Sequence, residues 1–103
     1  MKLLTAEKEG TLIVRITGDV DHHSAPNIRE EIDQELTKTR PRELILDLSG
    51  TDFMDSSGLG LILGRLRKAR ELGCRLTLLN PTEPILRILR LAGVEKTLNI
   101  EYL

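Results

Sequence analysis

The sequence predicts one α/β domain, with a mixed, mostly parallel sheet, packed helices and an antiparallel N-terminal edge. A chain of 103 residues is long enough for one ordinary core and too short for two. Short strand-like apolar runs alternate with longer helical patterns, which favours parallel strands joined by crossover helices. The first two strand-like runs are separated only by Glu9-Gly10, a pair suited to a hairpin turn.

The hairpin is expected at residues 3–6 and 11–17. Within residues 11–17 apolar and polar side chains alternate, so one face of this strand should be buried. Glycines precede and follow the strand as breakers. Residues 3–6 have a weaker pattern and are placed beside it as the antiparallel edge. The apolar positions of the stronger strand are Leu12, Val14 and Ile16.

A helix is expected from about Ser24 to about Lys38. Ser24 suits the N-cap, and Pro26 suits the first turn, where its missing N–H costs nothing. Apolar residues then recur every four positions among charged neighbours, which predicts one buried stripe. This stripe consists of Ile28, Ile32 and Leu36.

A central strand and a second long helix follow. Residues 43–48 form a nearly continuous apolar run, typical of a strand covered on both faces. From Gly58 the pattern becomes helical and ends at Gly73. Two more glycines inside this helix, Gly60 and Gly64, match no nucleotide-binding loop and are interpreted as letting the helix approach the sheet. The expected buried stripe is Leu59, Ile62, Leu63, Leu66 and Ala69. The basic residues expected to face solvent are Arg65, Arg67, Lys68 and Arg70.

The C-terminal part predicts a strand at residues 75–79, a helix and a last short strand at residues 98–100. Thr82 is the expected N-cap of this helix, which should end before Gly93. Its predicted buried stripe is Ile85, Ile88, Leu89 and Ala92.

Composition narrows the classes of function. The net charge of −1 and an aromatic content of 2% argue against direct binding of nucleic acid. No apolar run approaches the length of a membrane span, so we expect a cytoplasmic protein without a membrane partner. Cys74 is the only cysteine, which excludes an internal disulfide and indicates a small residue near the core.

The candidate site lies in two polar loops, residues 19–24 and 49–58, each of which follows a predicted strand. The carboxyl ends of neighbouring parallel strands meet at one edge of a sheet, so these loops should lie side by side. The residues of interest are Asp21, His22, His23, Asp55, Ser56 and Ser57.

Several functions remain open for these residues. Ser56 could be the nucleophile of a hydrolase, but the Gly-x-Ser-x-Gly elbow and an evident oxyanion-hole loop are missing. A metal site is disfavoured because adjacent histidines diverge and match no familiar ligand spacing. Ser56 or Ser57 could instead cap the helix. A kinase could also modify a serine here, because free N–H groups at a helix N-terminus accept a phosphoryl group.

Residues 18–25, GDVDHHSA, and residues 53–65, FMDSSGLGLILGR, strongly resemble the anti-sigma factor antagonists of the STAS domain family. They are most similar to the sporulation type, which frees sigma factor F. The resemblance extends over essentially the whole chain, so residues 1–103 are expected to form one STAS domain. The general-stress type of antagonist, or another STAS scaffold module, is the alternative. Family members often continue with a further C-terminal helix, whereas this sequence ends at Leu103.

The resemblance implies a binding switch rather than an enzyme, with no catalytic residue and no cofactor of its own. The unmodified protein would bind an anti-sigma factor that is also a serine kinase. That kinase, using its own Mg-ATP, would phosphorylate Ser56 and so end the complex. A PP2C-type phosphatase would reverse the modification. Phe53 and Met54 are expected to be core anchors that fix the serine loop, or interface residues if they are partly exposed next to Ser56. The implied partner-binding residues are Asp21, His22, His23, Asp55, Ser56, Ser57 and Gly58.

Overall fold

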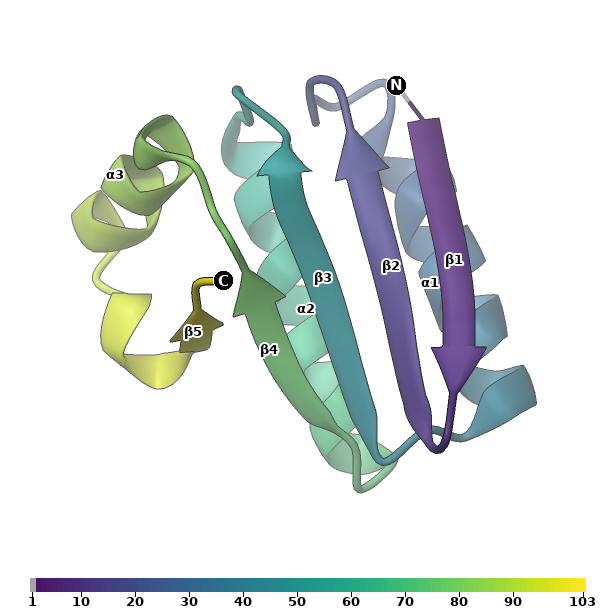
Figure 1. The fold of residues 1–103 in the computed structure, drawn as a ribbon. Helices are drawn as coiled ribbons and strands as arrows, with labels where there is room; N and C mark the ends of the chain where they lie inside the picture. The colour runs from purple at the N-terminus through teal and green to yellow at the C-terminus, as the bar shows by residue number, and fades with distance from the viewer. Residues whose placement is uncertain (1) are drawn as a thin grey trace.

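A computed structural model describes residues 2–103 and shows a five-stranded sheet in the order β1-β2-β3-β4-β5. β1 and β2 are antiparallel, and every other neighbouring pair is parallel (Figure 1). The mixed, mostly parallel sheet with an antiparallel N-terminal edge is therefore confirmed. The strands are β1 (Lys2–Lys8), β2 (Thr11–Thr17), β3 (Glu43–Gly50), β4 (Arg75–Leu79) and β5 (Asn99–Glu101). The helices are α1 (Ala25–Thr39), α2 (Ser56–Glu71), α3 (Glu83–Leu91) and the 3-10 turn η1 (Glu95–Thr97).

The hairpin between β1 and β2 has the turn expected from its sequence. Lys8 pairs with Thr11, which leaves Glu9 and Gly10 as the two turn residues. Both have positive φ values, 52° and 86°, the backbone that matches the twist of the flanking strands in a two-residue turn. The side chain of Arg42 donates a hydrogen bond of 3.2 Å to the carbonyl of Glu9, so the turn is also held from outside the hairpin.

The core lies between the sheet and the two long helices. α1 and α2 cover the same face of the sheet, whereas α3 lies beyond β4, near β5 (Figure 1). On β3 this arrangement buries Leu44, Leu46 and Leu48 completely. Ile45 and Asp47, on the opposite face of the strand, are only half-buried. The prediction that β3 is covered on both faces is therefore wrong, because its apolar run did not distinguish one helical layer from two.

The basic stretch of α2 is not uniformly exposed, as had been expected. Arg65 is 6% exposed, and its Nε lies 2.9 Å from Oδ1 of Asp33 on α1. Burial lowers the pKa of Arg65, whereas the Asp33 charge acts in the opposite direction. Arg67 and Arg70 do face solvent. The expectation was wrong for Arg65 because its partner is on another helix.

The glycines of α2 also divide into two kinds. A Cβ at Gly58 would lie 2.6 Å from the Cβ of Met54, so Gly58 is required by close packing against the preceding loop. A Cβ at Gly60 or Gly64 would meet no atom within 4 Å. The prediction that these two glycines let the helix approach the sheet is therefore wrong.

The C-terminal elements are close to the predicted ones, with one added feature. The last strand is shifted by one residue, and η1 before it was not predicted. Thr82 occupies the N-cap position of α3, but its hydroxyl donates to the carbonyl of Thr51 at 2.8 Å and does not cap the helix. Cys74 is buried, as expected. Among the described helices, none is both long and apolar enough to cross a bilayer.

Candidate functional site

The two polar loops lie side by side, as the topology predicted. The backbone N–H of Val20 donates to the carbonyl of Phe53 at 3.0 Å, and the N–H of Asp55 donates back to the carbonyl of Val20 at 3.2 Å. An isolated parallel bridge between Val20 and Met54 therefore continues the pairing of β2 and β3 beyond the strand ends. We call the surface formed by Asp21, His22, Asp55 and Ser56 at this edge the serine rim.

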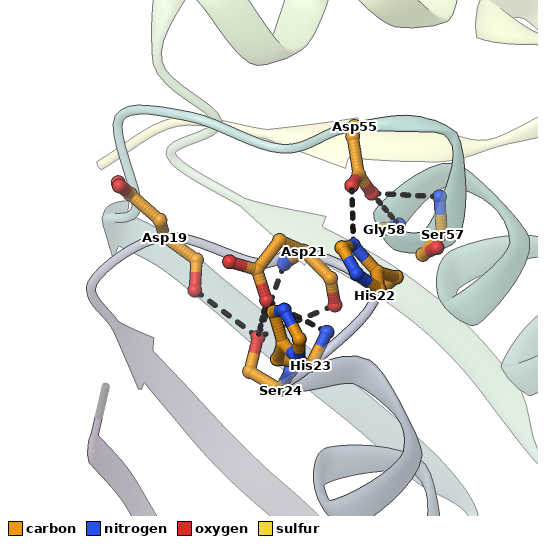
Figure 2. Close-up of polar contacts among 8 residues, drawn as sticks. All are labelled: Asp19, Asp21, His22, His23, Ser24, Asp55, Ser57 and Gly58. Carbon is orange, nitrogen blue, oxygen red and sulfur yellow. Dashed lines mark hydrogen bonds and ion pairs between the residues drawn. The ribbon is translucent and has the colours of Figure 1, made fainter.

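Asp21 orders the first loop through its own carboxylate. Its Oδ1 accepts hydrogen bonds from the backbone N–H groups of His23 at 2.9 Å and Ser24 at 3.0 Å (Figure 2). The Ser24 hydroxyl also lies 3.3 Å from this oxygen. The N–H of Ser24 contributes most to the lowered pKa of Asp21, because a donated hydrogen bond favours the ionised carboxylate. Ser24 occupies the N-cap position of α1, but its side chain makes no capping bond. Asp21 is therefore a fixed negative charge on the serine rim.

Asp55, rather than a serine, caps α2. Its Oδ1 accepts from the backbone N–H groups of Ser57 at 2.8 Å and Gly58 at 3.3 Å. The alternative in which Ser56 or Ser57 caps the helix is therefore excluded. A carboxylate at this position also complements the positive end of the helix dipole. The second loop is held by this cap and by its backbone bonds to Val20.

Ser56 is the first residue of α2, and its side chain is exposed. Within the described part of the chain, no hydrogen bond engages its hydroxyl. Ser57 is half-buried, and Gly58 is buried against Met54. Gly58 is therefore needed for packing against Met54, and its expected contact with a partner stays a prediction. Of the two serines, Ser56 has the more exposed side chain.

The two histidines lie on the exposed surface of the first loop. Nδ1 of His22 is 4.0 Å from Oδ2 of Asp55, so this side chain connects the two loops (Figure 2). The rings of His22 and His23 face each other with centroids 4.0 Å apart. Both side chains are exposed.

Phe53 is a site residue for which the expectation of a core anchor is wrong. It was expected to anchor the core together with Met54, but it is 51% exposed, whereas Met54 is 2% exposed. Val20 pairs with Met54, so the side chain of Met54 turns inward and that of the preceding residue turns outward. The strict alternation of an extended segment was the signal that could have revealed this. Phe53 adds an apolar contact surface near Ser56.

The groups of the serine rim are suited to binding another molecule. No hydrogen bond joins the Ser56 hydroxyl to either histidine among the described residues, so the nucleophile and base pairing of a hydrolase is not formed. In the same part of the chain, no three histidine, cysteine or carboxylate side chains gather as a candidate metal site. The rim offers the hydroxyl of Ser56, two fixed carboxylates and the exposed imidazole of His22, and the exposed Phe53 lies in the same loop as Asp55 and Ser56.

Residues 2–102 match the STAS domain family. The chain belongs to this family. An anti-sigma F factor antagonist of Paenibacillus polymyxa is 35% identical to this STAS domain over 91 residues, covering 88% of the chain and 78% of the relative. The anti-sigma F factor antagonist of Lysinibacillus sphaericus is 34% identical and covers 91% and 78%. An anti-sigma-B factor antagonist of Bacillus subtilis is 29% identical and covers 91% and 84%.

Solved structures show the same fold for this STAS domain. The unphosphorylated form of the anti-sigma factor antagonist SpoIIAA superposes with a TM-score of 0.85 at 27% identity, covering 99% of this chain and 88% of the other. The phosphorylated form of SpoIIAA from Bacillus superposes with a TM-score of 0.79, also at 27% identity, covering 99% and 91%. The fold of this STAS domain is thus similar to that of a relative in both of its states.

Proposed function

We propose that this STAS domain is an anti-sigma factor antagonist of the sigma F type, which binds an anti-sigma factor kinase and is released when Ser56 is phosphorylated. The observation that carries the proposal is the exposed Ser56 hydroxyl, which makes no hydrogen bond among the described residues and directly follows the fixed carboxylate of Asp55, the N-cap of α2. The similarity to two sigma F antagonists favours the sporulation type, and the weaker similarity to sigma-B antagonists makes the general-stress type the second candidate. The protein would act in the cytoplasm, as a switch and not as an enzyme.

In the bound state the serine rim would face the kinase. Asp21 is held by the backbone of its own loop, and Asp55 by the helix that it caps, so neither carboxylate has to be ordered on binding. Both would pair with cationic side chains of the partner. The exposed ring of Phe53 would supply the apolar contact next to them. Displacement of the sigma factor from the kinase would follow from occupation of this surface.

The modification would be a simple phosphoryl transfer. Oγ of Ser56 attacks the γ-phosphorus of ATP, the new O–P bond forms, the bond from that phosphorus to the β,γ-bridging oxygen breaks, and ADP leaves. The hydroxyl proton passes to a base of the kinase, which also brings Mg²⁺ and ATP. This chain contributes only the positioned hydroxyl. A PP2C-type phosphatase would hydrolyse the phosphoserine and restore the binding form.

Release would be electrostatic. A phosphoserine carries a charge of about −1.5 to −2 at neutral pH, and it would stand beside Asp55 on a rim that already carries Asp21. Burying that charge against a partner that offers no extra cation costs several kcal/mol, and about 4 kcal/mol weakens binding roughly a thousandfold. The fold need not change, which agrees with the similarity to SpoIIAA in both its unphosphorylated and phosphorylated forms.

The test is phosphorylation in a reconstituted mixture. The full chain is incubated with Mg-ATP and the anti-sigma F factor of Paenibacillus polymyxa, and intact-mass and fragment mass spectrometry locate the phosphate. We expect one phosphate, on Ser56. Ser57→Ala is the matched control and should be modified normally, whereas Ser56→Ala should bind but remain unmodified. A phosphate on Ser57, or no modification together with no complex, would refute the proposal.

A further inference from the structure

A groove of about 480 Å³ runs between α1 and α2, outside the serine rim but continuous with it through Ser57. On the α2 side it follows one stripe of the helix from Ser57 to Glu71. That stripe is about 21 Å long at 1.5 Å per residue. The opposite side of the groove is formed by the first turns of α1. The lining residues that matter here are Arg29, Ser57, Gly60, Gly64, Arg65 and Lys68.

The two glycines in the groove have no explanation within this chain. Both lie in the interior of α2, where glycine lowers stability relative to alanine. A Cβ at Gly60 or at Gly64 would meet nothing within 4 Å, so neighbouring residues do not require their absence. Glycine does allow another backbone to approach a helix closely. The groove is therefore suited to a chain that lies directly against α2.

The charge of the groove indicates what such a chain carries. Arg65 is only 6% exposed, and Nη1 of its guanidinium has no hydrogen-bond partner among the described residues. Arg65 lines the groove, and its Nε lies 2.9 Å from Oδ1 of Asp33 as an ion pair without hydrogen-bond geometry, so the guanidinium is a fixed cation at this surface. Arg29, Arg67 and Lys68 add three further cations, and Glu71 is the one carboxylate among the described lining residues. A lining with four cations and one carboxylate favours a carboxylate-bearing chain or another oxyanion.

We propose that the groove docks an extended, acidic segment of the anti-sigma factor, with its backbone against Gly60 and Gly64 and its carboxylates at Arg65 and Lys68. This inference rests on the proposed function and extends that interface along α2. A stripe of about 21 Å accommodates roughly six extended residues, whereas a compact anion fills only part of it. The partner would thus need a basic patch for the serine rim and an acidic segment for the groove, which fixes its orientation.

Charge reversal at Lys68 tests the electrostatic part of the groove proposal. Lys68→Glu and Arg70→Glu change the net charge equally on the same helix, but only Lys68 lines the groove. Binding of each full-length variant to the anti-sigma F factor of Paenibacillus polymyxa is measured by titration calorimetry at low salt. We expect Lys68→Glu to weaken binding at least tenfold and Arg70→Glu by less than about twofold.

A side chain added at Gly60 tests whether the backbone of the partner approaches α2 closely. Gly60→Leu places a side chain in the open space, and Arg70→Leu places the same side chain on the exposed surface. Both variants should unfold at or above the wild-type temperature. Only Gly60→Leu should lose affinity, again at least tenfold. Equal affinity for wild type, Lys68→Glu and Gly60→Leu would overturn the groove proposal and leave the proposed function intact.

Two other outcomes also decide the matter. Absence of any complex with the wild-type chain would overturn the proposed function and the groove proposal together. Inorganic phosphate is the probe for a free anion. If phosphate raised the unfolding temperature of the wild type but not of Lys68→Glu, while partner binding was the same for both proteins, the groove would be a small-anion site and the proposal would be wrong.

Discussion

Gly58→Ala should destabilise the protein, although alanine is the better helix former. The added Cβ would lie 2.6 Å from the Cβ of Met54 and 3.2 Å from its Cγ and Sδ. Met54 is 2% exposed and cannot retreat freely, because the residues on either side of it are bonded to Val20 by hydrogen bonds of 3.0 and 3.2 Å. Relief of the contact therefore requires a shift of α2 or of the paired loops.

Two opposing terms set the size of this effect. Replacing glycine by alanine in a helix interior gains about 0.5–1 kcal/mol, and overpacking a tight contact costs about 1–3 kcal/mol. The net loss at Gly58 should be about 1–2 kcal/mol. Gly60→Ala is the matched control in the same helix, where the new methyl group meets nothing and the gain of about 0.5–1 kcal/mol stands alone. The two variants should differ by about 2 kcal/mol.

Urea unfolding of the two variants and the wild type measures this difference directly. The free energy of unfolding is compared at equal m-values, so that a change in the denatured state is not mistaken for a change in packing. If Gly58→Ala is as stable as Gly60→Ala, the contact with Met54 does not constrain the loop, and our account of why glycine follows the serines is wrong.

Three further predictions follow from individual contacts. Asp55→Ala removes the cap of α2 and should cost about 1 kcal/mol in thermal or urea unfolding; an unchanged stability would show that the cap is dispensable. The pKa of Asp21 is lowered in the folded protein, chiefly by the N–H of Ser24. The ionised Asp21 carboxylate therefore stabilises the fold above the unfolded-state pKa of about 3.9, and this stabilisation is lost as the pH falls through the lower pKa of the folded state. The stability difference between wild type and Asp21→Asn should therefore shrink below about pH 4, and a difference that grew in acid would contradict the assigned sign. Asp33→Ala leaves the guanidinium of Arg65 buried without its ion-pair partner and should cost about 3 kcal/mol, whereas a loss below about 0.5 kcal/mol in urea unfolding would show that water replaces the carboxylate.

Periodicity predicted most of the fold because it reflects contacts that recur along a segment. The alternation of Leu12, Val14 and Ile16 located β2, and the continuous run at residues 43–48 located β3. The meeting of the two polar loops also followed from topology, since both loops extend from adjacent parallel strands. These features depend on residue type and order alone.

Two of the wrong predictions, those for Arg65 and Thr82, have a common physical cause, which is a contact with a residue distant in the sequence. Arg65 reads locally as one member of a basic stretch, and only the position of Asp33 on a neighbouring helix explains its burial. Thr82 reads as a cap, but its hydroxyl donates to the carbonyl of Thr51, which tertiary folding brings beside it. Local pattern cannot supply such partners.

Because Asp55 and not Ser56 caps α2, the proposed phosphorylation of Ser56 would not require loss of the fold. Had Ser56 been the N-cap, a phosphoryl group on its hydroxyl would have interfered with a bond worth about 1 kcal/mol. Asp55 makes that bond instead, to the N–H groups of Ser57 and Gly58, and it holds the second loop to Val20 through its own backbone. The hydroxyl of Ser56 is therefore not needed for folding. The proposed phosphorylation would change the charge of the serine rim and leave the described supports of that rim in place.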